Sequence, residues 1–249
     1  MNNDNTFVTT PDAVEHRISI GFRPAVRRYR LTGNEEHHIA VDDAARLTAS
    51  YRKEAGPDAF KAAYFGKEIL RAILAQEGCV GIRAYYAKHH DGTPTFVLTG
   101  ADENGNDLYD GVLAQDPWSC PPWCSEVNVL NSDNPEIAGV FQRRPMSLTG
   151  AESHFVTLAE ASEYTRLYRE SKRIGDSKAV YFGRRISEEI LGQDGCVGMR
   201  LYLAKEDSGR RTLVLAGVNA DGNDIVPGIL GEQVWDCPPW CSVVNPLNR

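Results

Sequence analysis

The sequence predicts an α+β protein made of two similar halves, each with two helices packed on an antiparallel sheet of three or more strands. Residues 20–131, the first half, align without gaps with residues 137–248, the second half. The shift is 117 positions, with 49 identities in 112 pairs. In each half, apolar residues first recur at helical spacing and then alternate along the chain. Glycine-containing hairpin turns follow. Helices that precede a run of strands are typical of α+β folds.

The organisation of the chain follows from this repeat and from its composition. Of the 249 residues, 42% are hydrophobic and 24% are charged, as in an ordinary globular protein. We predict an N-terminal extension at residues 1–19, a first domain at 20–131, a short linker at 132–136 and a second domain at 137–249. Each half is long enough to bury a core, and the short linker favours two domains that pack together.

The first predicted helix covers residues 41–54 in the first half and 158–171 in the second. Thr157 and Glu160 form a capping box, in which the threonine oxygen accepts from a first-turn amide. The first half has Ala40 at the capping position, so this cap is not shared. The prediction rests on the helical spacing of four residues of the second half, Leu158, Ala161, Thr165 and Tyr168.

The second predicted helix covers residues 59–76 and 177–193. Gly78 and Gly195 follow it, where a left-handed residue commonly ends a helix. An apolar stripe supports the helix in each half, formed by Phe65, Ile69 and Ile73 or by Phe182, Ile186 and Ile190.

Three strands are predicted after the second helix. The first begins at Val80 or Val197 and shows strict alternation, and the second covers residues 96–98 or 213–215. Asn104-Gly105 and Asp221-Gly222 predict tight hairpin turns in which both central residues have positive φ. A third strand through Leu108 or Ile225 then completes an antiparallel meander.

Charge and hydropathy exclude some classes of protein. A net charge of −7 and a pI near 5.4 argue against broad binding to nucleic acid or to an anionic membrane surface. We predict that the arginines at positions 23, 27, 28 and 30 form a solvated arm. No apolar run has the length of a membrane span, and the N-terminus lacks the pattern of a signal peptide. We therefore predict a cytoplasmic protein, in which thiols are mostly reduced, with export by another route left open.

The six cysteines are the main candidates for chemistry, because all of them correspond under the shift. One histidine in each half corresponds as well, which permits a three-cysteine, one-histidine zinc site, one per half. Its ligands would be His37, Cys79, Cys120 and Cys124 in the first half and His154, Cys196, Cys237 and Cys241 in the second. Structural zinc ligands usually come in two close pairs, so we favour packing cysteines with a capping histidine.

The Cys-Pro-Pro-Trp-Cys segments at residues 120–124 and 237–241 leave two redox alternatives. A structural disulfide within each segment is expected if the protein meets an oxidising environment. A catalytic redox pair is less favoured, because prolines give an extended approach instead of the helix N-terminus that lowers a thiol pKa.

Arginines in the first strand of each meander are a further candidate. Arg83 lies beside Tyr85, and both could meet Asp107, which follows the second predicted strand. The equivalent residues are Arg200, Tyr202 and Asp224. They would form either an anion-binding surface or a cross-strand ion pair, and we favour the ion pair. The chain has no Gly-x-Ser-x-Gly, phosphate-binding glycine loop or His-Glu-x-x-His motif.

Several motifs together resemble a family of small bacterial proteins of unknown function. They are His37-x-Ile39, Phe65-Gly66-Lys67-Glu68-Ile69-Leu70, Gly78-Cys79-Val80-Gly81-Ile82-Arg83, Asn104-Gly105-Asn106-Asp107 and Cys120-Pro121-Pro122-Trp123-Cys124. Members of that family carry one such domain, whereas this chain carries two. The resemblance covers nearly everything beyond residue 19 and implies no activity. The second half departs from it at residues 184–187, where Lys-Glu-Ile-Leu becomes Arg-Arg-Ile-Ser.

The leading functional hypothesis is a non-enzymatic interaction or assembly protein in which the two halves form an intramolecular pseudo-dimer. Its partner would be a second copy or another protein, and it would need no cofactor. Tryptophans beside prolines are candidate contact residues, namely Trp118, Trp123, Trp235 and Trp240. The alternative, which we favour for at least two of the four, is that they cover their own sheet. One alternative is a zinc- or thiol-dependent protein. Another is a small-ligand binder, which would have a polar cleft between the halves lined by residues that differ between them.

Overall fold

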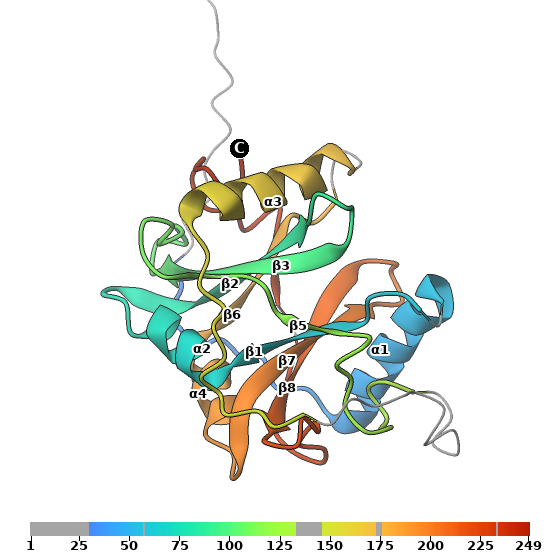
Figure 1. The fold of residues 1–249 in the computed structure, drawn as a ribbon. Helices are drawn as coiled ribbons and strands as arrows, with labels where there is room; N and C mark the ends of the chain where they lie inside the picture. Colours follow the sequence, from blue (N-terminus) through green and yellow to red (C-terminus); the bar gives the residue numbers. More distant parts are fainter. Residues whose placement is uncertain (1–29, 57, 133–145, 173–175, 233) are drawn as a thin grey trace, which may run out of the picture.

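The computed structural model describes residues 30–56, 58–132, 146–172, 176–232 and 234–249, and it has an α+β fold (Figure 1). The predicted extension, most of the predicted linker and three of the four arginines of the predicted arm lie outside these residues. The first half contains α1 (Val41–Ala55), β1 (Ala62–Gly66), α2 (Lys67–Leu74), β2 (Cys79–Lys88), β3 (Pro94–Asp102), β4 (Leu113–Ala114) and β5 (Trp118–Cys120). The second half contains α3 (Leu158–Glu170), β6 (Ala179–Gly183), α4 (Arg184–Leu191), β7 (Cys196–Lys205), β8 (Arg211–Asn219), β9 (Leu230–Gly231) and β10 (Trp235–Cys237). Each element of the second half begins 117 residues after its counterpart.

The two antiparallel sheets each combine strands of both halves. One has the strand order β5-β1-β7-β8-β9 and the other has the order β10-β6-β2-β3-β4. Strand β1 of the first half pairs with β7 of the second half, from the pair Ala62 and Tyr202 to the pair Gly66 and Gly198. Strand β6 of the second half pairs with β2 of the first half in the same way. The expectation that each half forms its own sheet is therefore corrected. Because both halves carry almost the same strand sequences, a local pattern does not specify which copy a strand joins.

A second correction concerns the helix predicted at residues 59–76. Its first part is strand β1, and only residues 67–74 form helix α2. All five residues of β1 are buried, which is the pattern of a central strand covered on both faces. Phe65 fits the apolar stripe of the following helix, so helical spacing concealed the strand. The second half repeats the arrangement with β6 and α4.

The remaining elements agree more closely with the sequence. Helices α1 and α3 occupy the predicted positions, and Thr157 and Glu160 form the predicted capping box. The turn after β3 differs from the predicted two-residue turn, because Gly105 is its only residue with positive φ. The Gly105 amide donates to the Asp102 carbonyl, as in a three-residue loop with a left-handed glycine. Leu108 lies outside any strand, and β4 pairs with β3 instead.

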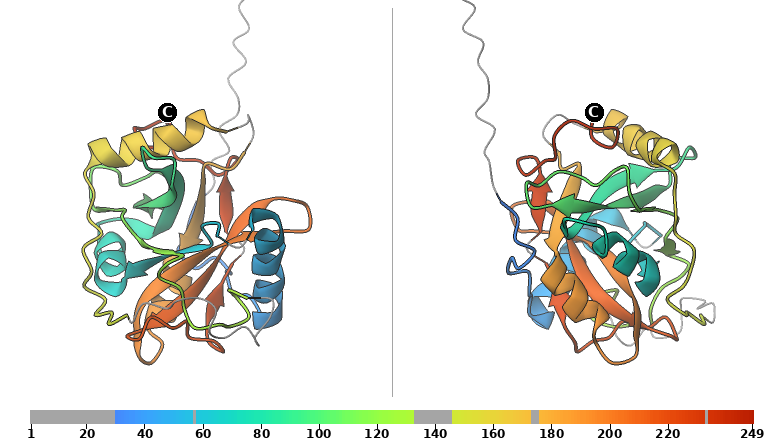
Figure 2. Two further views of the ribbon diagram at one scale, coloured as in Figure 1. Left: turned by 45° about the vertical axis from the view of Figure 1, so that its right-hand side comes forward. Right: turned by 90° about the vertical axis from the view of Figure 1, so that its left-hand side faces the viewer.

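The main core lies between the two sheets. Their inner faces contribute residues from both halves, and α2 and α4 pack against the same cluster. Helix α1 covers the outer face of the sheet that contains β7 and β8, whereas α3 covers the outer face of the other sheet (Figure 2). Within the described residues, no helix combines the length and hydropathy needed to cross a membrane.

Candidate functional site

Each half ends in a loop that is closed by a disulfide. The first tail loop comprises residues 120–131 and the second comprises residues 237–248, and the bonds Cys120–Cys124 and Cys237–Cys241 close the beginning of each loop. The Cα atoms of the bonded cysteines are 4.7 Å and 4.6 Å apart. Strands β5 and β10 lead into the loops beside strands β1 and β6, so each tail loop is held at a sheet that contains strands of both halves.

A buried ion pair of the first half anchors the second tail loop. Arg83 and Asp107 form this pair, and neither side chain is exposed. Oδ2 of Asp107 accepts hydrogen bonds from the Tyr85 hydroxyl at 2.5 Å and from Nδ2 of Asn245 at 2.7 Å. The backbone amide of Asp107 donates to Oγ of Ser242 at 2.9 Å. The network therefore joins the hairpin of one half to the tail of the other.

The same arrangement holds the first tail loop against the second half. Arg200 and Asp224 are paired and fully buried. Asp224 Oδ2 accepts from Asn128 at 2.9 Å and from Tyr202 at 2.5 Å, while its amide donates to Ser125 Oγ at 2.9 Å. The predicted cross-strand ion pairs are thus confirmed in both halves. Because the guanidinium groups are covered, they do not form an anion-binding surface.

The charges in these networks depend on their partners. Burial alone disfavours the charge of Arg200, but Asp224 outweighs it and raises the pKa of that guanidinium. Burial together with the neighbouring carboxylate raises the pKa of Tyr85 and of Tyr202. Such a network holds its charges and protons firmly, which suits a structural anchor better than an acid–base catalyst.

Sequence reasoning found the arginines and aspartates of the networks but missed the tail-loop residues that complete them. Ser125-x-x-Asn128 recurs as Ser242-x-x-Asn245 at the common shift. This repeated serine and asparagine pair could have indicated the tail-loop contacts, since polar residues that are kept in both halves are candidates for buried hydrogen bonds.

In each half, the turn before the first helix (α1 or α3) makes a second contact with the other half. Oε1 of Glu35 accepts from the amide of Thr32 at 2.6 Å, and Oε2 accepts from the Tyr181 hydroxyl of the other half at 3.1 Å. The carbonyl of Gly33, which has φ of 79°, accepts from the Arg185 amide in the first turn of α4. Each turn therefore supplies a backbone cap to a helix of the other half, where free amides need acceptors. The equivalent residues are Thr149, Gly150, Glu152, Tyr64 and Glu68.

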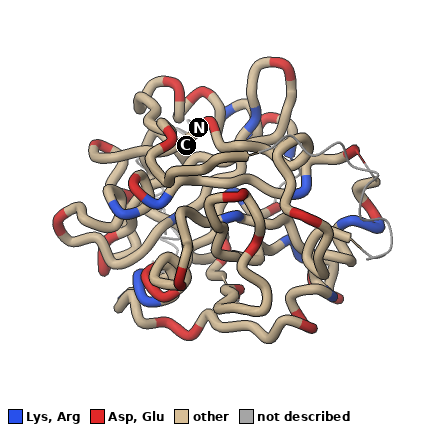
Figure 3. Tube along the Cα trace, turned by 60° about the horizontal axis from the view of Figure 1, so that its bottom comes forward, with Lys and Arg blue, Asp and Glu red and all other residues tan. Residues whose placement is uncertain are grey.

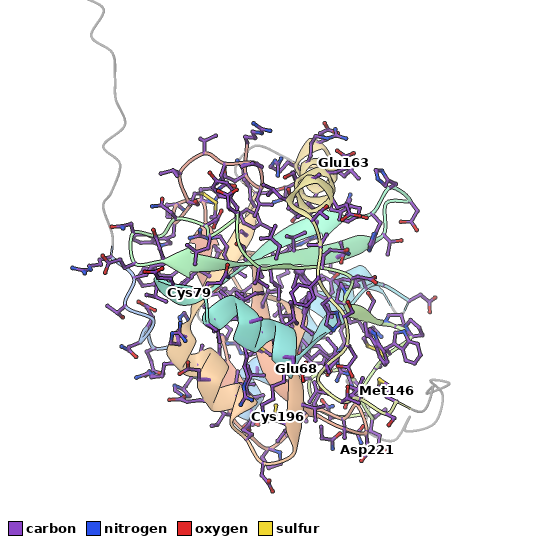
Figure 4. All side chains as sticks on the ribbon, turned by 60° about the vertical axis from the view of Figure 1, so that its left-hand side comes forward. Glu68, Cys79, Met146, Glu163, Cys196 and Asp221 are labelled. Carbon is purple, nitrogen blue, oxygen red and sulfur yellow. A yellow bond between two sulfur atoms is a disulfide. The ribbon has the colours of Figure 1, made fainter. Side chains whose placement is uncertain are left out.

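The predicted zinc ligands do not come together in the structure. Cys120, Cys124, Cys237 and Cys241 are consumed in disulfides, which cannot ligate zinc while they are intact. The thiols of Cys79 and Cys196 donate to backbone carbonyls within their own strands, and Figure 4 shows the two cysteines at separate places. His37 and His154 lie beside the backbone carbonyls of Glu232 and Asp116. Among the described residues, no cluster of three or more His, Cys, Asp or Glu side chains is arranged to hold a metal.

The predicted contact tryptophans are half-buried and packed in pairs. Trp118 and Trp123 have ring centroids 4.8 Å apart, and Trp235 and Trp240 have centroids 5.0 Å apart. Each pair rests on a tyrosine of the adjacent strand, Tyr64 or Tyr181. The most exposed large apolar residues of the tail loops are instead Val243 and Val244, with exposed fractions of 61% and 82%.

In the view of Figure 3, acidic and basic residues are interspersed along the described chain. A shallow cavity of about 410 Å³ lies between α1 and the β7–β8 hairpin, where Arg46 and Asp207 form an ion pair across it. Its other lining residues are Ile39, Asp43, Leu47, Glu206, Ser208 and Glu232.

The fold and these contacts define an α+β protein in which the two halves exchange strands and anchor each other's tail loops. No family model matches this chain, and no match was found among curated proteins or solved structures. The resemblance to small bacterial proteins therefore stays a prediction.

Proposed function

We propose that this protein is a non-enzymatic interaction module, an intramolecular pseudo-dimer that presents its second tail loop to a protein partner. One observation carries the proposal: two neighbouring valines, Val243 and Val244, are largely exposed on a loop whose base is rigidly held. Apolar residues fixed in this way are pre-organised for contact, because little conformational entropy is lost when they bind.

The anchoring of the loop supports this role. The Cys237–Cys241 disulfide closes its start, and Ser242 and Asn245, on either side of the two valines, bind the buried Asp107. Asn245 Nδ2 also donates to the Val243 carbonyl at 3.1 Å. The valines therefore have a fixed backbone and free side chains, with Trp240 at the edge of the same loop.

The two tail loops are not equivalent as surfaces. The first loop has Glu126 at the position of Val243, and its Val127 is only partly exposed. A charged residue at the centre of an interface disfavours apolar contact. The second loop is therefore the proposed contact surface, and the first serves as an internal control.

The test uses a photo-activated cross-linking residue placed at position 243 of the full chain in its native cells, and at position 126 for comparison. We expect a discrete cross-linked species from position 243 that disappears with Val244→Glu and persists with the control Val129→Glu. A species of twice the chain mass of 27.6 kDa would identify a second copy as the partner. Equal, diffuse labelling from both positions would overturn the proposal, provided that circular dichroism shows all variants folded.

A further inference from the structure

Three buried polar atoms between the halves lack a hydrogen-bond partner among the described residues. They are the Tyr86 hydroxyl, Nζ of Lys172 and Oδ1 of Asp236. Tyr86 and Asp236 are 5% and 6% exposed, and Lys172 is partly exposed with its ammonium end covered. Buried polar atoms are nearly always hydrogen-bonded, so a cluster of orphaned atoms indicates a missing partner.

The three residues gather in one place. Nζ of Lys172 lies 4.4 Å from the ring centroid of Tyr168 and 5.9 Å from that of Tyr86, and the two rings are 5.4 Å apart. Asp236 of β10 pairs with Val180 of β6, and Val180 pairs in turn with Ala84 of β2. Tyr86 lies two residues after Ala84 on the same strand. Asp236 and Tyr86 therefore share the inner face of one sheet.

This cluster exists in one half only. The positions equivalent to Tyr86, Lys172 and Asp236 hold Leu203, Ala55 and Ser119. The same scaffold therefore forms without the cluster, and its polar groups are not a requirement of the fold. A polar site lined by residues that differ between the halves is what a ligand-binding protein of this kind would have.

The electrostatics suit a reactive amine. Burial lowers the pKa of Lys172 to about 8, so part of the amine is neutral near neutral pH. Burial also raises the pKa of Asp236, against the opposing effect of its ion-pair partner Arg210, which makes this carboxylate a better proton acceptor. The charged and titratable groups that face Lys172 are Tyr86, Tyr168, Asp176, Lys178, Arg211 and Asp236.

We propose that Lys172 is a nucleophile that forms a Schiff base with small aldehydes or 2-oxo acids. The neutral amine attacks the carbonyl carbon, a carbon–nitrogen bond forms, and the carbonyl oxygen becomes a hydroxyl by taking the first proton that the nitrogen loses. The Asp236 carboxylate relays the second proton of the nitrogen to that hydroxyl, which leaves as water as the carbon–nitrogen double bond of the imine forms. Tyr86 donates a hydrogen bond to the carbonyl oxygen. The step needs no oxidant or reductant, and it is independent of the tail-loop interaction.

The experiment treats the full chain with glyoxylate and cyanoborohydride, which reduces an imine to a stable secondary amine. Intact mass and peptide mapping then count and locate the adducts. We expect one fast adduct, at Lys172, whose rate rises with pH through about 8 and then levels off. Lys172→Arg should abolish it, whereas Lys53→Arg, which changes an exposed lysine, should leave it intact.

A matched pair of tyrosine variants tests the site more closely. Tyr86→Phe removes an unbonded hydroxyl and should slow the adduct at Lys172 by at least about tenfold without unfolding the protein. Tyr51→Phe, at the position equivalent to Tyr168, should have no such effect. Adducts spread over exposed lysines, with none favoured at Lys172, would overturn the proposal. A water molecule that bridges the three orphaned polar atoms would then be the missing partner. The wild-type peptide map gives this answer even if Lys172→Arg fails to fold.

Discussion

Asp107 in the hairpin of the first half accepts a hydrogen bond from Asn245 in the tail of the second half at 2.7 Å. The same carboxylate is paired with the buried Arg83. A single side chain therefore neutralises a buried charge and fastens a loop that lies 138 residues away in the sequence.

Removal of this carboxylate should be costly. Asp107→Ala leaves Arg83 buried without its counter-charge, and we expect a loss of about 3–5 kcal/mol in the free energy of unfolding. Urea denaturation measures it. Asp110→Ala, at an exposed position, is the control and should change stability by less than about 0.5 kcal/mol. Similar values for the two variants would mean that the ion pair does not stabilise the fold.

The state of the cysteines can be counted directly. Under denaturing, non-reducing conditions we expect two titratable thiols, from Cys79 and Cys196, and six after reduction. In the folded protein the Cys79 thiol should react slowly, because burial raises its pKa. Six thiols before reduction would contradict the disulfides and agree with the predicted cytoplasmic location. Two bound zinc ions per chain would restore the metal hypothesis.

A pair of glycine variants separates steric clash from backbone strain. Gly33 has φ of 79°, and a Cβ there would lie 2.5 Å from the Val80 carbonyl oxygen. Gly92 has a similar φ of 85° but open space around it. Alanine at either position strains the backbone by about 1–2 kcal/mol. We expect Gly33→Ala to lose at least about 2 kcal/mol more than Gly92→Ala in thermal or urea unfolding, and equal losses would show that the turn relaxes freely.

Two histidines should give opposite pH dependence. Burial lowers the pKa of His154 below 6.5, so the unfolded chain binds a proton that the folded chain does not, and stability falls as pH drops below about 6.5. Glu36 raises the pKa of His38 above 6.5, so the folded chain binds this proton more readily than the unfolded chain does. The contribution of His38 to the stability of the fold therefore grows as the pH falls toward 6.5. The groups around His154 are Glu152, Asp116 and Tyr64. Denaturation between pH 7.5 and 5 should be flatter for His154→Gln and steeper for His38→Gln; the reverse order would contradict both assignments.

Much of the fold was predictable because helix and strand patterns are local. The capping residue Thr157 and the alternation from Val80 onward specify their elements without reference to the rest of the chain. Strand β1 was missed because Phe65 fits both the buried strand and the helix that follows it. The partner of β1 was not predictable either, since β2 and β7 present nearly the same edge.

The candidate sites divide in a similar way. The ion pair of Arg83 and Asp107 joins the first strand of one hairpin to the turn after its second strand, within a single half. Asn245 and Asp107 meet only because the strands are exchanged, and no local spacing encodes that contact. Lys172, Tyr86 and Asp236 come from three separate segments, and none of them belongs to a motif.

The exchange of strands has a consequence for any chain that carries a single half. A fragment ending before residue 146 would contain β1 and β2 without β7 and β6, the strands that complete their sheets. Such a fragment has to find a second one before it can fold, so its stability would depend on its concentration. Covalent joining replaces that search with an intramolecular encounter at a high effective concentration. The fused chain can therefore fold when it is the only copy present, and each half becomes free to change residues that a symmetric pair would have to keep identical.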